Sequence, residues 1–348
     1  MNTNNQHLTK KRKSEHIDIV LKKDVNASGI TTHFEQYRFL HNALPEIAFS
    51  EISLATTFLG KKLKAPFLIS SMTGGTERTG KINYILAEVA EEKGWAMGLG
   101  SVRAAIEHPE TADTFYVRKH APTIPILANL GAVQFNYGYD IDQCRQVVEI
   151  TEADALILHL NSMQEVFQPE GDTDFRNLLQ KIEQICKKLQ VPVGVKEVGW
   201  GISGDIARKL IDVGVAFIDV AGAGGTSWSQ VEKFRTKDPL RREAAEAFAN
   251  WGIPTADCIR DVHLHVPECT LIGSGGIQNG VEAAKAIALG SDLVGFGRSL
   301  LAPAANSSLD ALKNLLDRIE LECKIAMFGI GARCISELQG TNRLQKIS

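Results

Sequence analysis

The sequence has no pair of cysteines at the spacing C-x-x-C and no apolar run long enough to cross a bilayer. Its six cysteines lie among apolar or helical residues, which predicts reduced thiols with structural roles. His263 and His265 lie near Cys269, but no further ligand is spaced to complete a metal site. No hydrophobic signal segment follows the polar, basic start of the chain, so we expect a cytoplasmic protein without a membrane partner.

Charge of one sign is not in large excess either. The 38 Lys and Arg against 41 Asp and Glu give a net charge of −3, which provides no general attraction to nucleic acid or anionic membranes. The basic cluster Lys10–Lys13 is the feature that suggests a nucleic-acid-binding or regulatory protein. Because the net charge of the whole chain is slightly negative, we expect no nucleic-acid partner. The 348 residues fit one (β/α)8 barrel with a tail and a long loop, although two domains remain possible on length alone.

Short apolar runs bounded by Gly, Asn or Pro predict the strands. They begin at Ala65, Trp95, Ile124, Asp154, Val191, Val215, Cys269 and Asp292. Several runs are almost continuously apolar, as expected of a parallel sheet that helices cover. Because amphipathic stretches separate eight such runs, we predict an α/β fold, specifically a (β/α)8 TIM barrel.

The flanking segments have predictions of their own. Residues 1–64 are expected to form an N-terminal extension and residues 65–348 the barrel. Residues 1–11 are polar and expected to be mobile, whereas residues 47–64 are expected to form a hairpin that plugs the bottom of the barrel. The long segment 226–254 after the sixth strand has a length typical of loops that cover active sites.

Apolar residues at helical spacing predict several helices. They are Lys81–Lys93, Asp174–Leu189, a stretch over 240–250 within the long segment, Gly280–Leu289 and a closing helix over Leu321–Leu338.

Polar and glycine-rich residues follow the predicted strands. They are Ser70–Gly75, Gly98–Arg103, Asn129, His159–Asn161 with Gln164 and Glu165, Lys196–Glu197, and Gly222–Trp228. Each alone is explained by turn chemistry, but the carboxyl ends of barrel strands meet at one mouth, where active sites of this fold lie. We therefore expect these groups to line one site.

The last two strands end in glycine-rich loops, Gly273–Ile277 and Gly295–Arg298. The loops after the seventh and eighth strands are the usual phosphate site of barrels, because glycines let backbone N–H groups approach phosphate oxygens. Tight strand-to-helix turns are the alternative explanation. We predict phosphate binding here.

Lys196 is a charged residue at the end of an apolar strand. Its candidate roles are a Schiff-base nucleophile, a general base or the counter-charge of an anionic cofactor, and the neighbouring Glu197 could also neutralise it. The N-terminal cluster Arg12–His16 is, by composition alone, typical of a solvated charged surface.

Seven of these motifs occur together and in order. They are RKSEH at 12–16, SMTGG at 71–75, GSVR at 100–103, HLNSMQE at 159–165, VKEVG at 195–199, GAGGTSW at 222–228 and GSGG at 273–276. This set resembles the type 2 isopentenyl-diphosphate isomerases over nearly the whole chain. The resemblance implies an FMN-dependent barrel enzyme of isoprenoid biosynthesis that interconverts isopentenyl and dimethylallyl diphosphate. It also implies reduced FMN and Mg²⁺, NADPH as the reductant, no net redox change, and a tetramer or octamer.

The same resemblance implies roles for individual residues. Residues implied to bind FMN are Ser71, Met72, Thr73, Gly74, Ser101, Asn129, Lys196, Thr226, Gly275, Gly276, Ile277, Gly297 and Arg298. Lys196 is implied to lie near N1 and C2=O of the flavin. Some relatives place Ser at the position of Ala221, so a contact to the flavin phosphate is absent here.

The substrate side is implied in the same way. The substrate-binding residues are Arg12, Lys13, His16, Ser101, Arg103, Gln164 and Trp228. The implied catalytic residues are His159, Asn161, Gln164 and Lys196. Glu165 is implied to bind Mg²⁺ together with phosphate oxygens. Arg and Lys suit a multiply charged diphosphate, so the resemblance turns the N-terminal cluster into a substrate clamp.

Two other FMN or nucleotide chemistries are less consistent with the motifs. An oxidoreductase of 2-hydroxy acids uses an active His and paired Arg on late strands, whereas the segment after the sixth strand is GAGGTSW. A purine-nucleotide dehydrogenase needs a nucleophilic Cys in that loop, which the sequence lacks.

Overall fold

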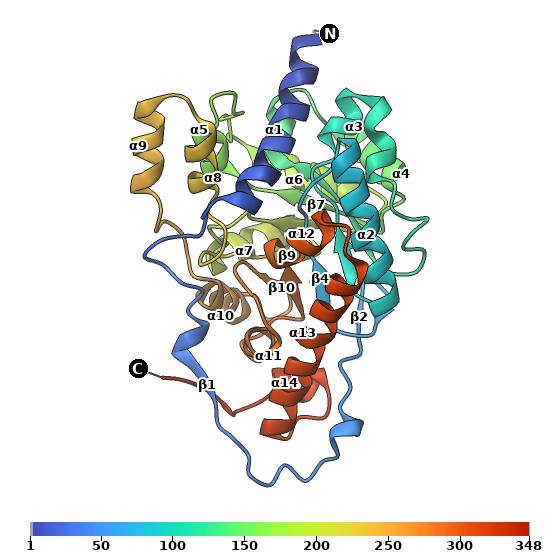
Figure 1. Ribbon diagram of the computed structural model, residues 1–348, viewed down its shortest axis with the longest axis vertical. Coiled ribbons are helices and arrows are strands. Elements are labelled where there is room, and N and C mark those ends of the chain that lie inside the picture. Colours follow the sequence, from blue (N-terminus) through green and yellow to red (C-terminus); the bar gives the residue numbers. More distant parts are fainter. Residues whose placement is uncertain (1–2, 348) are drawn as a thin grey trace.

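A closed barrel of eight parallel strands forms the centre of the protein (Figure 1). The computed structural model describes the backbone of residues 3–347 and the side chains of residues 13–347. The barrel strands are β4 Phe67–Ile69, β5 Ala96–Gly98, β6 Ile126–Gly131, β7 Ala155–His159, β8 Val193–Lys196, β9 Phe217–Asp219, β10 Thr270–Ser274 and β11 Leu293–Phe296. Each lies within a predicted run, so the (β/α)8 barrel is confirmed.

The strand register places several polar residues at one level of the barrel. His159 pairs with Lys196 across β7 and β8, and Lys196 pairs with Asp219 across β8 and β9. Paired residues on neighbouring parallel strands point to the same face. The carboxyl ends of β7, β8 and β9 therefore present these three side chains side by side.

Helices surround the barrel, as expected when both faces of a parallel sheet are buried. The longer ones are α2 Glu77–Lys93, α4 Ile141–Thr151, α6 Leu178–Lys188, α7 Gly204–Asp212, α10 Thr255–His265, α11 Gly280–Ala288, α12 Arg298–Ala305 and α13 Leu309–Ile330. Shorter ones are α3 Arg103–Glu107, α5 Ser162–Phe167, α14 Ile335–Gln339 and the 3₁₀ turns Phe34–Gln36, Phe49–Glu51, Pro109–Phe115 and Ala132–Asn136.

Most helix predictions are confirmed within a few residues, but the closing helix is corrected. Residues 321–338 are not one helix, because α13 ends at Ile330 and Gly331 adopts a left-handed conformation with φ 80°. This conformation is a common way for a helix to end at glycine. The chain then resumes as the separate helix α14.

A small hairpin closes the bottom of the barrel, as predicted. It consists of β2 Thr56–Phe58 and β3 Lys61–Leu63, which pair antiparallel. The Phe58 ring lies edge-on to Phe217 of β9, with 5.4 Å between the ring centroids. Phe58 and Leu63 share a buried cluster with residues of the barrel strands, so the hairpin fills the interior from below.

The N-terminal extension has more regular structure than the sequence predicted. We expected a mobile tail over residues 1–11, but the chain is helical from Thr3 to Lys22 as α1. Further on, β1 Tyr37–Phe39 pairs antiparallel with β12 Leu344–Lys346 near the C-terminus. The boundary at residue 64 stays a prediction.

The long segment 226–254 forms two helices, α8 Trp228–Arg235 and α9 Pro239–Ala247. The predicted helix over 240–250 corresponds to α9, whereas α8 was not predicted. Helices α1, α5, α8 and α9 gather at the upper end of the molecule in Figure 1. Within the described residues, no helix is both long and apolar enough to span a membrane.

Candidate active site

One cavity of about 610 Å³ opens at the carboxyl ends of the barrel strands. Residues from the loops after all eight strands, together with α1, line it. The predicted site residues among them are Lys13, His16, Ser71, Met72, Thr73, Ser101, Arg103, Asn129, His159, Asn161, Gln164, Glu165, Lys196, Thr226, Trp228, Gly275, Gly276, Ile277, Gly297 and Arg298.

Among the described side chains, one predicted residue, Gly74, is not among those lining the cavity. Gly74 lies against the buried ring of Phe115, and a Cβ at Gly74 would stand 2.0 Å from Phe115 Cε1. Its glycine is explained by this close approach. The side chain of Arg12 lies outside the described residues.

Glycines bring the loops after β9 and β10 into direct contact. Gly275 and Gly276 have φ of +109° and +71°, values that side chains rarely adopt. A Cβ on Gly275 would lie 2.2 Å from the carbonyl oxygen of Gly222, and one on Gly225 would lie 2.6 Å from Gly276 Cα. The exposed backbone of these loops, with α12 beginning beside them at Arg298, forms a cradle that fits a phosphate group.

A buried lysine and a buried aspartic acid lie on neighbouring strands at the level where β8 and β9 end. The Lys196 side chain is buried, and its Nζ donates to the carbonyl oxygen of Glu197 at 2.5 Å. Asp219 is 1% exposed; burial raises the pKa of its carboxyl group, and the charge of Lys196 opposes that rise. Asp219 Oδ1 accepts a hydrogen bond from Ser274 Oγ at 2.5 Å, while Oδ2 has no hydrogen-bond partner among the described residues.

Asp219, which contacts Ser274 of the cavity lining, is a residue that we did not predict. The signal was available, because Asp219 is a single carboxylate inside an apolar run and its strand neighbours the strand of Lys196. Glu197 was considered as the residue that neutralises Lys196, but its carboxylate points into its own loop. Its Oε2 accepts backbone N–H groups of Val198, Gly199 and Trp200 at 2.6, 2.7 and 2.6 Å.

The end of β7 carries a connected polar group. His159 Nδ1 lies 2.7 Å from Asn129 Oδ1, and because an amide oxygen only accepts, this ring nitrogen carries the hydrogen of the contact. Asn161 Nδ2 donates to Glu165 Oε1 at 2.7 Å and to Gln164 Oε1 at 3.3 Å. Asn161 Oδ1 is buried without a hydrogen-bond partner among the described residues, which leaves an acceptor for a bound molecule.

Glu165 is held in place from both sides. Besides Asn161, the backbone N–H of Asp172 donates to Glu165 Oε2 at 2.8 Å. No three His, Cys, Asp or Glu side chains in the described part of the chain form a metal cluster. A Mg²⁺ ion here would therefore need oxygens from a bound phosphate or water besides Glu165, which is how Mg²⁺ usually binds.

Arg103 reaches the cavity but has acidic partners of its own. Its Nη1 donates to Asp172 Oδ2 at 2.7 Å and its Nε to Glu107 Oε1 at 2.6 Å. Burial lowers the pKa of Arg103, and its two carboxylate partners outweigh this and raise that pKa above its ordinary value. Arg103 therefore stays charged in the site.

Helix α1 brings Lys13 and His16 to the cavity. Lys13 Nζ donates to the carbonyl oxygen of Ser101 at 3.0 Å and lies 5.0 Å from the centroid of the Phe115 ring. His16 Nε2 lies 2.8 Å from Glu232 Oε1, and the His16 ring stands edge-on to Trp228. Glu232 is 1% exposed and was not predicted, because its partner lies on a helix 216 residues away.

The fold and the match to a family profile define a (β/α)8 barrel of the FMN-dependent dehydrogenase class. The profile of the family described as FMN-dependent dehydrogenase matches residues 6–117 and 143–345. The isopentenyl-diphosphate delta-isomerase of Oceanobacillus iheyensis is 54% identical over 333 residues, covering 96% of this chain and 95% of that one. That of Nostoc sp. is 49% identical and covers 99% and 98%. The chain belongs to this family of isopentenyl-diphosphate delta-isomerases, which confirms the resemblance.

Solved structures support the fold. A Pediococcus acidilactici protein described as a lactate oxidase matches with a TM-score of 0.69 and 17% identity, covering 100% of this chain and 95% of that one. A mandelate oxidase with an FMN adduct matches with a TM-score of 0.65 and 16% identity, covering 94% of both chains. At these identities the likeness concerns the barrel and not the reaction.

Proposed function

We propose that the protein interconverts isopentenyl diphosphate and dimethylallyl diphosphate, using reduced FMN and Mg²⁺ with no net redox change. One observation carries the proposal. A single cavity joins a glycine cradle and the charged Lys196 to a second set of groups, Lys13, Asn161 and Glu165. The first set suits a phosphate-bearing anionic cofactor, and the second suits a diphosphate with its metal ion. The similarity to isopentenyl-diphosphate delta-isomerases supports this assignment.

The cofactor side of the cavity has three tasks in this proposal. Backbone N–H groups of the loops at Gly275–Ile277 and Gly297, with Thr226, would bind the FMN phosphate. Met72, Thr73 and Asn129 would line the ring. Lys196 would stabilise negative charge on the reduced ring, because a fixed cation in a buried site acts strongly on nearby charge. When bound, reduced FMN supplies electrostatic stabilisation or a proton.

The substrate side would orient the diphosphate and the hydrocarbon chain. Lys13, reaching into the cavity from α1, would bind diphosphate oxygens, and Glu165 would bind Mg²⁺. Gln164, Asn161 and His159 would lie near the reacting carbons. The bond migration removes one proton from carbon and adds one to carbon, so the electrons balance and no oxidant is needed.

An isotope experiment tests the reaction. In D₂O with photoreduced or dithionite-reduced FMN, isopentenyl diphosphate should become dimethylallyl diphosphate and gain deuterium, while the oxidised protein should be inactive. NADPH should prime the flavin once without further consumption. NADPH oxidation matched one-to-one with product would mean hydride transfer and would support an oxidoreductase instead. Failure to bind FMN in any redox state would overturn the cofactor assignment.

The assembly state belongs to the same proposal. We expect a homo-oligomer, a tetramer or an octamer, which light scattering coupled to gel filtration measures directly. The cytoplasmic location and the lack of a nucleic-acid partner stay predictions. Salt-sensitive binding to arbitrary DNA would contradict the second of these.

A further inference from the structure

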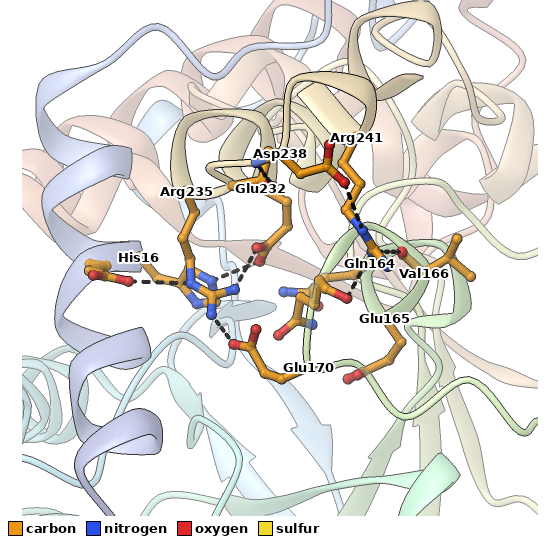
Figure 2. Close-up of polar contacts among 12 residues, drawn as sticks. His16, Gln164, Glu165, Val166, Glu170, Glu232, Arg235, Asp238 and Arg241 are labelled. Atoms are coloured by element: carbon orange, nitrogen blue, oxygen red, sulfur yellow. Dashed lines mark hydrogen bonds and ion pairs between the residues drawn. The ribbon is translucent and has the colours of Figure 1, made fainter. Parts of the chain in front are cut away.

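The insertion between β9 and α10, residues 226–254, contacts two separate elements of the substrate side. Arg235, the last residue of α8, is the centre of these contacts, and its side chain is 10% exposed. Its Nε lies 3.3 Å from Glu15 Oε2 of α1, and its Nη1 lies 2.7 Å from Glu232 Oε2 of α8. Its Nη2 contacts Glu170, which follows α5. One guanidinium therefore joins three segments (Figure 2).

A second arginine of the insertion holds the end of α5. Arg241 Nη1 donates to the carbonyl oxygens of Val166 and Gln168 at 2.9 and 3.2 Å. The last carbonyls of a helix have no partner within the helix, so such donors stabilise its end. Figure 2 shows Arg241 reaching Val166 from the insertion, just beyond Gln164 and Glu165.

The insertion is one of the neighbours that hold helix α1, together with α12 and with Arg78 of α2, which pairs with Asp18 at 3.0 Å. Helix α1 lies outside the barrel and packs against α8 and α12. Its polar contacts to α8 include, among the described side chains, the Arg235–Glu15 pair and the His16–Glu232 hydrogen bond. Lys13 stands one helical turn from His16, so the location of its Nζ in the cavity follows from where α8 holds the helix.

Arg235 is the cation that three carboxylates share, and Glu232 is the buried one among them. Glu232 is 1% exposed and also contacts His16, whereas Glu15 and Glu170 are partly exposed. Removing one partner of a buried charged pair is costly, because the remaining charge stays out of water. Loss of Arg235 would therefore take a charged partner from Glu232 and remove the contacts that link Glu15 of α1 and Glu170 to α8.

We propose that Arg235 is a positioning residue that couples α1 to the end of α5, so that Lys13 and Glu165 are held over the cavity as one unit. The proposal rests on the proposed function only where it assigns these two elements to the substrate. It gives the insertion a role as a clamp across the mouth of the barrel.

Hydrogen–deuterium exchange on the FMN-loaded protein tests the coupling without reference to activity. Arg235→Ala should speed exchange about tenfold in both 13–22 and 166–172. Glu15→Gln should affect mainly the first segment and Glu170→Gln mainly the second. Lys233→Ala is the matched control, because Lys233 pairs with Glu246 inside the insertion and should change neither segment. Arg235→Ala that frees one segment only, or none, overturns the proposal.

Kinetics then connect the coupling to the substrate site. Arg235→Ala should raise the KM for isopentenyl diphosphate about tenfold with the Kd for FMN within twofold. Arg235→Lys, which keeps the charge but not the fork of donors, should lie between, and it serves if the alanine variant does not fold. An unchanged KM with faster exchange overturns the positioning role. If the protein does not turn over isopentenyl diphosphate at all, the proposed function fails while exchange still reports on the coupling.

Discussion

The loops after β9 and β10 meet through glycines, whereas α1, α5 and α8 meet through charged side chains. On the cofactor side, a Cβ at Gly275 or Gly276 would overlap the neighbouring loop, so backbone shape defines the surface. On the substrate side, Arg235 and Arg241 connect segments that are far apart in the sequence. The first side is therefore sensitive to an added atom, and the second to a lost charge.

Gly275→Ala should have the largest effect if this contrast is correct. The new Cβ would lie 2.2 Å from Gly222 O, and the residue would keep a φ of +109° that strains any side chain. The loop must move, so we expect FMN affinity to fall about 100-fold, or about 2.7 kcal/mol. Fluorescence titration with FMN measures this.

Gly138→Ala provides the control for Gly275→Ala. Gly138 also has a positive φ, +88°, but a Cβ there meets nothing within 4 Å. It should share the backbone strain and keep full FMN affinity. Equal losses in the two variants would show that strain, rather than contact between the loops, controls binding.

Glu165→Gln should be next in size and should leave the flavin bound. In the proposed function this change removes a charged ligand of Mg²⁺, and a hydrogen bond to a charged group, taken as the guide, contributes about 1.5–3 kcal/mol. We expect kcat/KM to fall about 10- to 100-fold and the Mg²⁺ requirement to rise. Assays over a Mg²⁺ series with the flavin spectrum recorded in parallel measure both. Loss of flavin from this variant would place Glu165 on the cofactor side and break the comparison.

Lys13→Ala should have a smaller effect, confined to substrate affinity. Lys13 is only half-buried, so water can partly replace its ammonium group in the variant. We therefore expect KM to rise about tenfold with kcat nearly unchanged. Lys22→Ala on the same helix is the control, because Lys22 is exposed and pairs with Asp18. Unchanged kinetics in both variants would indicate that the N-terminal cluster is a solvated charged surface and not a substrate clamp.

The same contrast explains what the sequence could predict. The eight strands and the glycine loops carry local signals, apolar runs and close-approach residues, so they were found with near-correct bounds. Helix α1 has a polar composition without an apolar stripe, and its helicity was missed. Arg235, Glu232 and Asp219 were missed because their roles depend on which distant segments the fold brings together. The break at Gly331 was missed because apolar residues continue beyond it.

Asp219→Asn should have the smallest effect, and it tests whether the buried carboxyl group next to Lys196 is neutral or ionised. Burial raises the pKa of Asp219 in the folded protein above the ordinary value of an aspartic acid, which the unfolded chain keeps, so an interval of pH lies between the two pKa values. As pH rises through this interval, Asp219 loses its proton in the unfolded chain before it does so in the folded protein. The neutral buried acid therefore stabilises the fold below the interval, and this stabilisation is lost as the pH passes through it. The free energy of unfolding of the parent, relative to the variant, should therefore fall as pH rises. Urea unfolding of both proteins from pH 4 to 7 measures how this difference in free energy changes with pH. The slope is the test, and not the difference at a single pH, because asparagine also replaces the unpartnered Oδ2 with a donor. A rising difference would mean that Lys196 holds Asp219 ionised below its ordinary pKa, and that the two residues form an ion pair before any cofactor binds.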